Sequence, residues 1–137
     1  MRFDRFRCVL ATLVIAGCSL AMGCGGGVEW APVEGTVTDN GRPAAGIQVT
    51  FEPLAGKLGQ IATGVTDEAG RYRLAGPDGQ PDGAIVGPNR VTLNVYMEDS
   101  GDELTALPKS TVPLRFRDGS TVKEVPPAGI EAADFAY

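Results

Sequence analysis

The chain has 137 residues, with 17 acidic against 12 basic side chains and a net charge of −5 at pH 7. This acidity argues against a nucleic-acid partner, because such binding depends on Lys and Arg neutralising phosphates. The chain holds no histidine, which excludes Ser-His-Asp and Cys-His catalysis and removes the commonest transition-metal ligand.

The N-terminus has the pattern of a secretory signal peptide. Three arginines stand within residues 2–7, and residues 8–23 carry no charge. That uncharged run is shorter than the roughly 20 residues that an α-helix needs to cross a bilayer. A basic start, a short apolar region and small residues before a break are typical of an export signal rather than of a membrane span. We therefore expect residues 1–23 to be a signal helix.

Two cysteines compete for the end of this signal. Residues 15–18 read IAGC and residues 21–24 read AMGC, and both resemble the lipobox of bacterial lipoproteins, in which a cut before the cysteine precedes its lipidation. Cys24 is favoured because it leads into a glycine tether and because a cut there leaves no odd thiol in an oxidising compartment. Cys18 remains the alternative, because Ile15, three residues before it, matches the branched residue of the lipobox better.

The lipobox implies a membrane anchor made of lipid. Two or three acyl chains hold a protein firmly, since each buried methylene contributes roughly 0.8 kcal/mol. Residues 24–31 would be the lipidated cysteine and its tether, and residues 32–137 the folded domain. Neither candidate cysteine is followed by the aspartate that resembles an inner-membrane retention signal. We expect a cell-envelope protein, with the outer membrane as the favoured address.

Strict alternation of apolar and polar residues follows the tether. Residues 47–52 read IQVTFE and residues 91–95 read VTLNV, and a period of two is typical of half-buried strands. The alternation predicts strands near residues 32–38, 46–53, 61–66, 70–75, 89–97, 112–117, 120–125 and 130–137. It predicts a core of Val33, Val37, Ile47, Val49, Phe51, Val65, Tyr72, Leu74, Val91, Leu93 and Val95.

Turn residues separate these segments. Asn40-Gly41 supplies two positions at which a positive φ is readily adopted. Asp67 can accept a hydrogen bond from the backbone two residues on, and Gly70 can take a left-handed conformation. The stretches 76–88 and 98–111 are expected to be long loops. Many short, one-sided strands predict an all-β sandwich, because each sheet must bury its apolar face on another.

Two segments, VEGTVTDNGRPAAGIQVTF at 33–51 and TGVTDEAGRYRL at 63–74, resemble the carboxypeptidase regulatory-like domain, a prealbumin-like (transthyretin-like) fold. The family pattern is V-x-G-x-V, a turn with Gly, a basic residue and Pro, then T-D-x-x-G-x-Y/F-x-L. Gly87-Pro88 stands where the family has a Pro-Gly-type turn. The resemblance covers about residues 32–97 and implies a single Greek-key β-sandwich of about seven strands. With the lipobox, the chain resembles small lipoproteins of planctomycete-type bacteria.

The motif residues have structural meanings, so they identify a scaffold rather than an activity. Gly35, for example, lets its strand bend or lets another backbone approach. One enzyme of this fold superfamily, hydroxyisourate hydrolase, uses histidines and a C-terminal Tyr-Arg-Gly-Ser signature. This chain lacks histidine and ends in ADFAY. We therefore expect no catalytic residue and no cofactor.

Acidic residues in the loops are the remaining candidates for a ligand site. Asp78 and Asp82 flank Gly-Gln-Pro, and Asp99 and Asp102 belong to an acidic cluster in the next loop. Carboxylate oxygens suit Ca²⁺, but the spacing is not that of an EF-hand, and solvated charge is the plainer interpretation. Trp30 is either a stacking platform for carbohydrate or, as we favour, a packing residue where the tether meets the domain.

The sequence therefore predicts a lipid-anchored, non-catalytic β-sandwich with a binding or structural role. Loops on a rigid scaffold concentrate binding residues, so we expect Asp78, Asp82, Asp99 and Asp102 to engage the partner, with no metal site assigned. The expected partners are the membrane, through lipid, and an envelope protein or polysaccharide, but no nucleic acid. A carbohydrate- or Ca²⁺-binding surface domain is the alternative, and an unrecognised hydrolase comes third.

Overall fold

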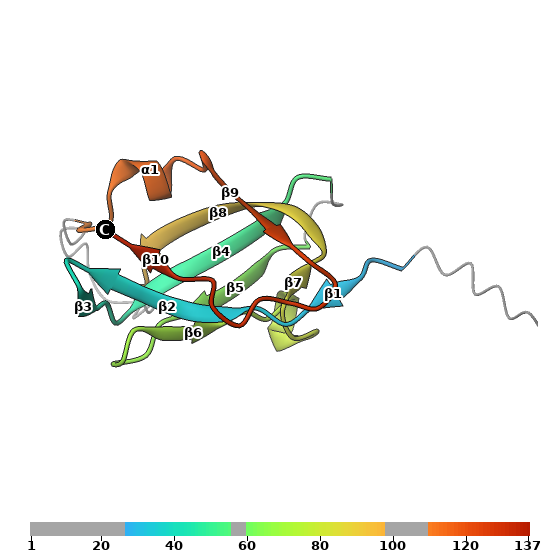
Figure 1. The fold of residues 1–137 in the computed structure, drawn as a ribbon, viewed down its shortest axis with the longest axis horizontal. Helices are drawn as coiled ribbons and strands as arrows, with labels where there is room; N and C mark the ends of the chain where they lie inside the picture. Colours follow the sequence, from blue (N-terminus) through green and yellow to red (C-terminus); the bar gives the residue numbers. More distant parts are fainter. Residues whose placement is uncertain (1–26, 56–59, 98–109) are drawn as a thin grey trace, which may run out of the picture.

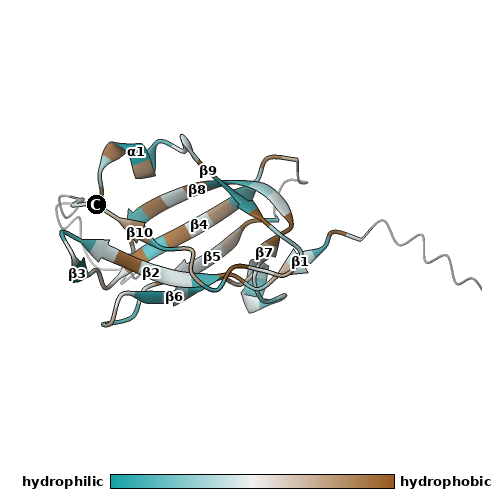
Figure 2. Cartoon of the chain, viewed as in Figure 1, coloured by the Kyte–Doolittle hydropathy of each residue, from teal (hydrophilic) through white to brown (hydrophobic). Residues whose placement is uncertain are grey.

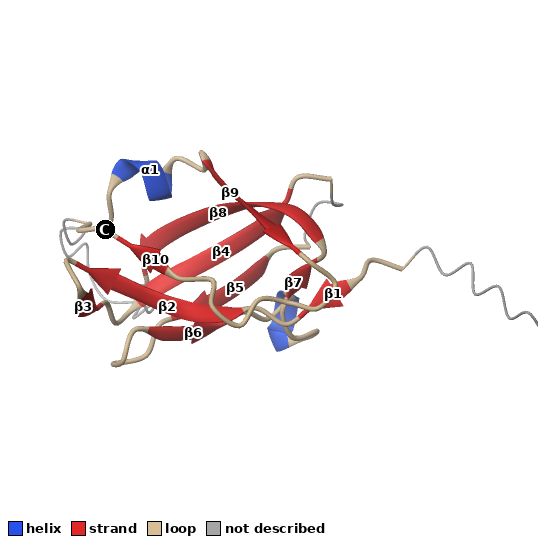
Figure 3. Ribbon diagram, in the orientation of Figure 1, coloured by secondary structure: helices blue, strands red, loops and turns tan. Residues whose placement is uncertain are grey.

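The structure is a computed structural model that describes residues 27–55, 60–97 and 110–137. Strands dominate it, and the helices are single turns at opposite ends of the strands (Figure 3). The prediction of an all-β fold is confirmed, whereas the expected signal helix lies outside the described residues. In chain order the elements are β1 (Trp30–Ala31), β2 (Glu34–Asp39), β3 (Arg42–Pro43), β4 (Ile47–Pro53), β5 (Ala62–Val65), β6 (Arg71–Arg73), the 3₁₀ helix η1 (Pro77–Gly79), β7 (Ala84–Ile85), β8 (Gly87–Val95), α1 (Leu114–Arg117), β9 (Thr121–Val125) and β10 (Phe135–Ala136).

One sheet, here called the β4 sheet, has the strand order β5-β4-β8-β9, with every neighbouring pair antiparallel. Val49 and Phe51 are fully buried on one face of β4, whereas Gln48 and Thr50 are half-buried on the other. The register places Val49 opposite Leu93, so apolar side chains meet on the inner face. Figure 2 shows the same alternation as brown and paler bands along β4 and β8.

The second sheet, here called the β2 sheet, is arranged around β2. β3 and β6 pair with β2 in antiparallel fashion, and β10 pairs with it in parallel. In Figure 1, β2 and β6 are drawn below β4 and β8, and β10 lies beside β2. A bridge between Thr63 and Ala75 joins β5 to the chain after β6. A separate pair, β1 with β7, lies at the end where the described chain begins.

A single apolar core draws buried side chains from both sheets. Val95 and Trp30 are partly buried against it, which agrees with the packing role favoured for Trp30. The predicted core is confirmed for Val33, Val37, Ile47, Val49, Phe51, Tyr72, Leu74, Val91 and Leu93.

The assignment of Val65 to the core is wrong, because this side chain is 40% exposed. Val65 lies opposite Gln48, on the outer face of the β4 sheet. The inward positions of β5 are Ala62, which is buried, and Gly64, where an added Cβ would collide with the backbone of Arg73. Small residues therefore face inward because β6 covers β5 closely, and alternation alone does not say which face is covered.

The predicted strand at 112–117 is also wrong, because α1 occupies its second half. Pro113 stands at the N-cap of this turn, and proline is compatible with the start of a helix because no intrahelical bond needs its missing N–H. Phe116 then packs edge-on against Phe135, with 6.1 Å between the ring centroids. That aromatic contact, rather than an alternating strand face, determines the local structure.

The stretch 76–88 is more ordered than a loop. It contains η1 and β7, and β8 already begins at Gly87 rather than near residue 89. β7 forms because Ala84 and Ile85 are both buried and pair with β1. This pairing fixes the residues that follow the tether against the body of the domain.

The predicted turns are confirmed. Asn40 and Gly41 have φ angles of 49° and 79°, as the hairpin between β2 and β3 requires. The Asp67 carboxylate accepts hydrogen bonds of 2.9 Å from the amides of Ala69 and Arg71. Gly70 has a φ of 73°. Local turn chemistry could therefore be predicted from the sequence without knowledge of the tertiary fold.

Residues 130–137, here called the closing segment, run parallel to β2. The predicted strand over this range is realised in part, as a bridge between Ile130 and Val33 and then as β10. At Gly35 the two backbones approach so closely that an added Cβ would collide with Ala133. The expectation that another backbone approaches Gly35 is therefore confirmed, and glycine is required there by space.

Two side chains fasten the closing segment. The buried Tyr72 hydroxyl donates a hydrogen bond to the carbonyl oxygen of Ala133. The Asp134 carboxylate accepts hydrogen bonds from the amide of Thr36 at 2.8 Å and from its hydroxyl at 2.9 Å. Burial, and then the nearby Asp134 charge, raise the pKa of Tyr72, because both disfavour the phenolate.

We predict that Tyr72→Phe lowers the free energy of unfolding by about 1–3 kcal/mol, because it leaves the Ala133 carbonyl without its buried donor. The pH dependence should change as well. Above the ordinary tyrosine pKa of about 10, the unfolded chain releases the Tyr72 proton while the folded chain keeps it, so the parent loses stability as pH rises. The variant should lose less between about pH 9 and pH 11. Urea unfolding at several pH values measures both effects.

The matched control is Tyr96→Phe, the same substitution at a tyrosine that is 43% exposed. It should change stability by no more than about 0.5 kcal/mol. Equal stability of Tyr72→Phe and Tyr96→Phe, or identical alkaline slopes in parent and Tyr72→Phe, would contradict the fastening role of Tyr72.

Candidate functional site

The acidic residues predicted to bind a partner fall into two groups. Asp78 in η1 and Asp82 just after it are exposed, at the end of the fold where β8 begins. Asp99 and Asp102 lie outside the described residues, as do Cys18 and Cys24. The second loop leaves the domain after the other end of β8, whose nine residues span roughly 30 Å. The two predicted loops are therefore rooted at opposite ends of the β4 sheet.

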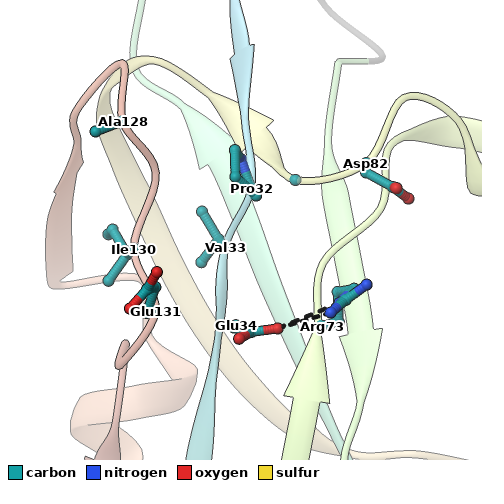
Figure 4. Close-up of a pocket in the computed structure, with 9 residues that line it drawn as sticks. Pro32, Val33, Glu34, Arg73, Asp82, Ala128, Ile130 and Glu131 are labelled. Carbon is teal, nitrogen blue, oxygen red and sulfur yellow. Dashed lines mark hydrogen bonds and ion pairs between the residues drawn. The ribbon is translucent and has the colours of Figure 1, made fainter.

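A cavity of about 220 Å³ opens beside β2 on the outer face of the β2 sheet. Figure 4 shows Ile130 and Glu131 on one side of the β2 chain, with Arg73 and Asp82 on the other. The floor is formed by β2 and the residues before it, including Glu34. The closing segment, β6 and the end of the η1 loop thus each supply one wall.

A second cavity of about 360 Å³ adjoins the first, since the two share Glu34 and Glu131. It extends toward Arg71 of β6 and Asp134 of the closing segment. Together the two cavities form one shallow depression, here called the β2–β6 groove. Its charged side chains are Glu34, Arg71, Arg73, Asp82, Glu131 and Asp134.

The charges of this groove are only partly neutralised within the protein. Arg73 donates to one carboxylate oxygen of Glu34 from Nε at 3.3 Å and from Nη2 at 3.0 Å. Arg71 forms an ion pair with Asp67, a residue outside the groove, with 3.7 Å between Nε and Oδ2. Asp82 and Glu131 form no ion pair within the described part of the chain. Asp134 accepts hydrogen bonds from Thr36 but has no cationic partner among the described residues either. The groove therefore presents three carboxylates without an ion pair, which favours a ligand that carries a cationic group.

The hydroxyl groups of the groove are engaged in hydrogen bonds within the protein. The Tyr72 hydroxyl is already bonded to Ala133, and its raised pKa keeps it protonated. The Thr36 hydroxyl donates to the Asp134 carboxylate, and the same carboxylate oxygen also accepts the Thr36 amide, which holds the closing segment on β2. Among residues 27–55, 60–97 and 110–137, no three His, Cys, Asp or Glu side chains converge into a group that could hold a metal ion.

Sequence reasoning found some of these residues and missed others. Arg71 and Arg73 alternate with the predicted core residues Tyr72 and Leu74, and both are exposed on β6. Glu34 has a detectable signal, because it is an outward position in an alternating strand. Glu131 has none, because it enters the groove only when the closing segment lies along β2.

The lipobox, on which the predicted anchor depends, lies outside the described residues. Within the described part of the chain, no helix is long and apolar enough to cross a bilayer. No family model, curated protein or solved structure matches the chain. The function must therefore be argued from the groove, the sheet faces and the position of the tether.

Proposed function

We propose that the protein is a lipid-anchored, non-catalytic module of the cell envelope that binds a partner on the surface of a β-sandwich. The lipobox at Cys24, with Cys18 as the alternative, supports the anchor. The finer fold assignment, a prealbumin-like Greek-key sandwich of the carboxypeptidase regulatory-like type, belongs to the same proposal. Its support is a common core between two sheets, together with Gly35, Gly70 and Tyr72 in the roles that the motif implies.

The observation that carries this proposal is the position of the groove relative to the tether. Residues 25–29 separate Cys24 from β1, and the six Cα–Cα steps from Cys24 to Trp30 span at most about 20 Å. Pro32, Asp82 and Ala128 line the groove at the same end of the domain as β1 (Figures 1 and 4). An anchored domain would therefore hold the groove within reach of components at the membrane surface.

The charge of the groove indicates the kind of partner. Asp82 and Glu131 are exposed and unneutralised, so a cationic segment of an envelope protein complements them. A Ca²⁺ site has weaker support, because the described carboxylates do not converge. A hydrolase has weaker support too, because the hydroxyl and carboxylate that pair in the groove, Thr36 and Asp134, hold the closing segment on β2.

We predict that Cys24→Ala abolishes membrane attachment, because it removes the acylated residue. Washed membranes should retain the parent and Cys18→Ala, while Cys24→Ala accumulates in the soluble fraction as a precursor or mis-processed chain. Metabolic labelling with a fatty acid, followed by intact-mass analysis, identifies the modified residue. Membrane retention and lipid labelling of Cys24→Ala together with their loss in Cys18→Ala would move the anchor to Cys18. Absence of lipid from the parent would contradict the anchor.

A second prediction concerns the groove. The double variant Asp82→Asn/Glu131→Gln should bind a fluorescent tetralysine peptide about fivefold more weakly than the parent, because two exposed attractions of about 0.5 kcal/mol each are lost. The matched control, Glu68→Gln/Glu124→Gln, removes the same charge from exposed positions outside the groove. Fluorescence anisotropy of the full chain in neutral detergent measures both. Equal weakening in the two double variants would show attraction to net charge only and would contradict a groove site.

A further inference from the structure

The outer face of the β4 sheet carries an ordered array of uncharged polar side chains. Thr50 lies directly opposite Thr63 on one side and Thr92 on the other, so three threonines form a row across three strands. Gln48 lies opposite Asn94 in the next row. Neighbouring strands are about 4.8 Å apart, which places these groups at regular intervals on one surface. We call these five residues the amide–hydroxyl face.

The centre of this face is free of charge, in contrast to the β2–β6 groove. The nearest charged residues, Glu52 and Arg90, lie at one end of the array. They form an ion pair with 3.3 Å between Arg90 Nη1 and Glu52 Oε2. Glu124 lies at the margin, on β9. A chain with a net charge of −5 thus presents a neutral patch, and the complementary partner of such a patch is itself uncharged.

Tyr96 adds an aromatic ring beside the array. Its amide donates to the carbonyl oxygen of Gly46 at 2.8 Å, which continues the ladder between β8 and β4 by one residue. Since side chains alternate along a strand, Tyr96 lies on the same side as Asn94. Tyr96 is 43% exposed, and Gly46, which lies opposite it, has no side chain to cover the ring. A half-exposed tyrosine offers a flat apolar surface together with a polar hydroxyl.

Neither fold stability nor self-association accounts for this composition. Asn is depleted in strands, so Asn94, the penultimate residue of β8, is not explained by strand formation. The exposed apolar residues of this face, Val65 and Val122, lie on the outer strands β5 and β9. A stable interface between two copies requires a larger apolar centre, whereas the residues at the centre here carry hydroxyl and amide groups. Anionic polymers are disfavoured because Arg90, the cation at the array, is already paired with Glu52.

We propose that the amide–hydroxyl face binds a neutral polysaccharide. Hydroxyl and amide side chains both donate and accept hydrogen bonds, which matches the hydroxyl groups of sugars. The apolar C–H face of a sugar ring can pack on Tyr96 while neighbouring sugars lie over Gln48, Thr50 and Asn94. This inference goes beyond the proposed function, because it requires neither the β2–β6 groove nor the lipid anchor.

The test uses the full chain in neutral detergent and four insoluble neutral polymers: cellulose, chitin, amylose and cross-linked dextran. The parent should be depleted from solution by at least one of them. Tyr96→Ala and Thr92→Lys should each weaken that retention about tenfold, because the first removes the stacking surface and the second places a charge in the array. Thermal unfolding of each variant confirms that it is folded.

The matched control is Thr38→Lys, the same substitution at a half-buried threonine on the outer face of the β2 sheet. It should be retained like the parent. Failure of all four polymers to retain the parent would overturn the proposal, as would equal losses for Thr92→Lys and Thr38→Lys. Light scattering that shows a dimer in the parent and a monomer in Thr92→Lys would overturn it too, by making the face a contact between copies.

Discussion

The fold depends on one close approach between two backbones, that of the closing segment along β2 at Gly35. Only glycine fits at that position, because a Cβ would collide with Ala133. The approach lets the closing segment run parallel to β2 and brings Ala133 and Phe135 into the core. Tyr72 and Asp134 then fasten it from the two sides. Without this contact, β2 would be left with an open edge and the core without one of its walls.

The same contact explains how the domain divides its two outer surfaces. The closing segment supplies Glu131 and Asp134 to the β2 sheet, so that surface becomes a charged depression. The closing segment contributes no residue to the outer face of the β4 sheet. The centre of that face is uncharged. If both proposals hold, one small scaffold offers two chemically different sites, one for a cationic partner and one for a neutral polymer.

Local patterns predicted the parts of this structure that depend on local chemistry. Alternation gave the inner faces of β2, β4 and β8, and turn residues gave the hairpins at Asn40 and Gly70. The need for a close approach at Gly35 could be predicted, but its partner could not, because Ala133 is remote in sequence. Val65 was misassigned for a similar reason, since the close cover of β5 by β6 is a tertiary property. The strand expected at 112–117 gave way to an aromatic contact of Phe116 that no local pattern encodes.

Amide hydrogen exchange read by mass spectrometry tests the central role of Gly35 most directly, by comparing the full-length parent with Gly35→Ala and Gly41→Ala. Gly41→Ala is the control that separates backbone strain from steric collision. The φ of Gly41 is 79°, which strains alanine, but no atom lies within 4 Å of an added Cβ. Peptides covering residues 130–137 should lose protection in Gly35→Ala while peptides of β4 and β8 keep most of theirs. The same peptides should stay protected in Gly41→Ala. Full protection of residues 130–137 in Gly35→Ala would contradict the account, because the closing segment would then dock without the space that glycine provides.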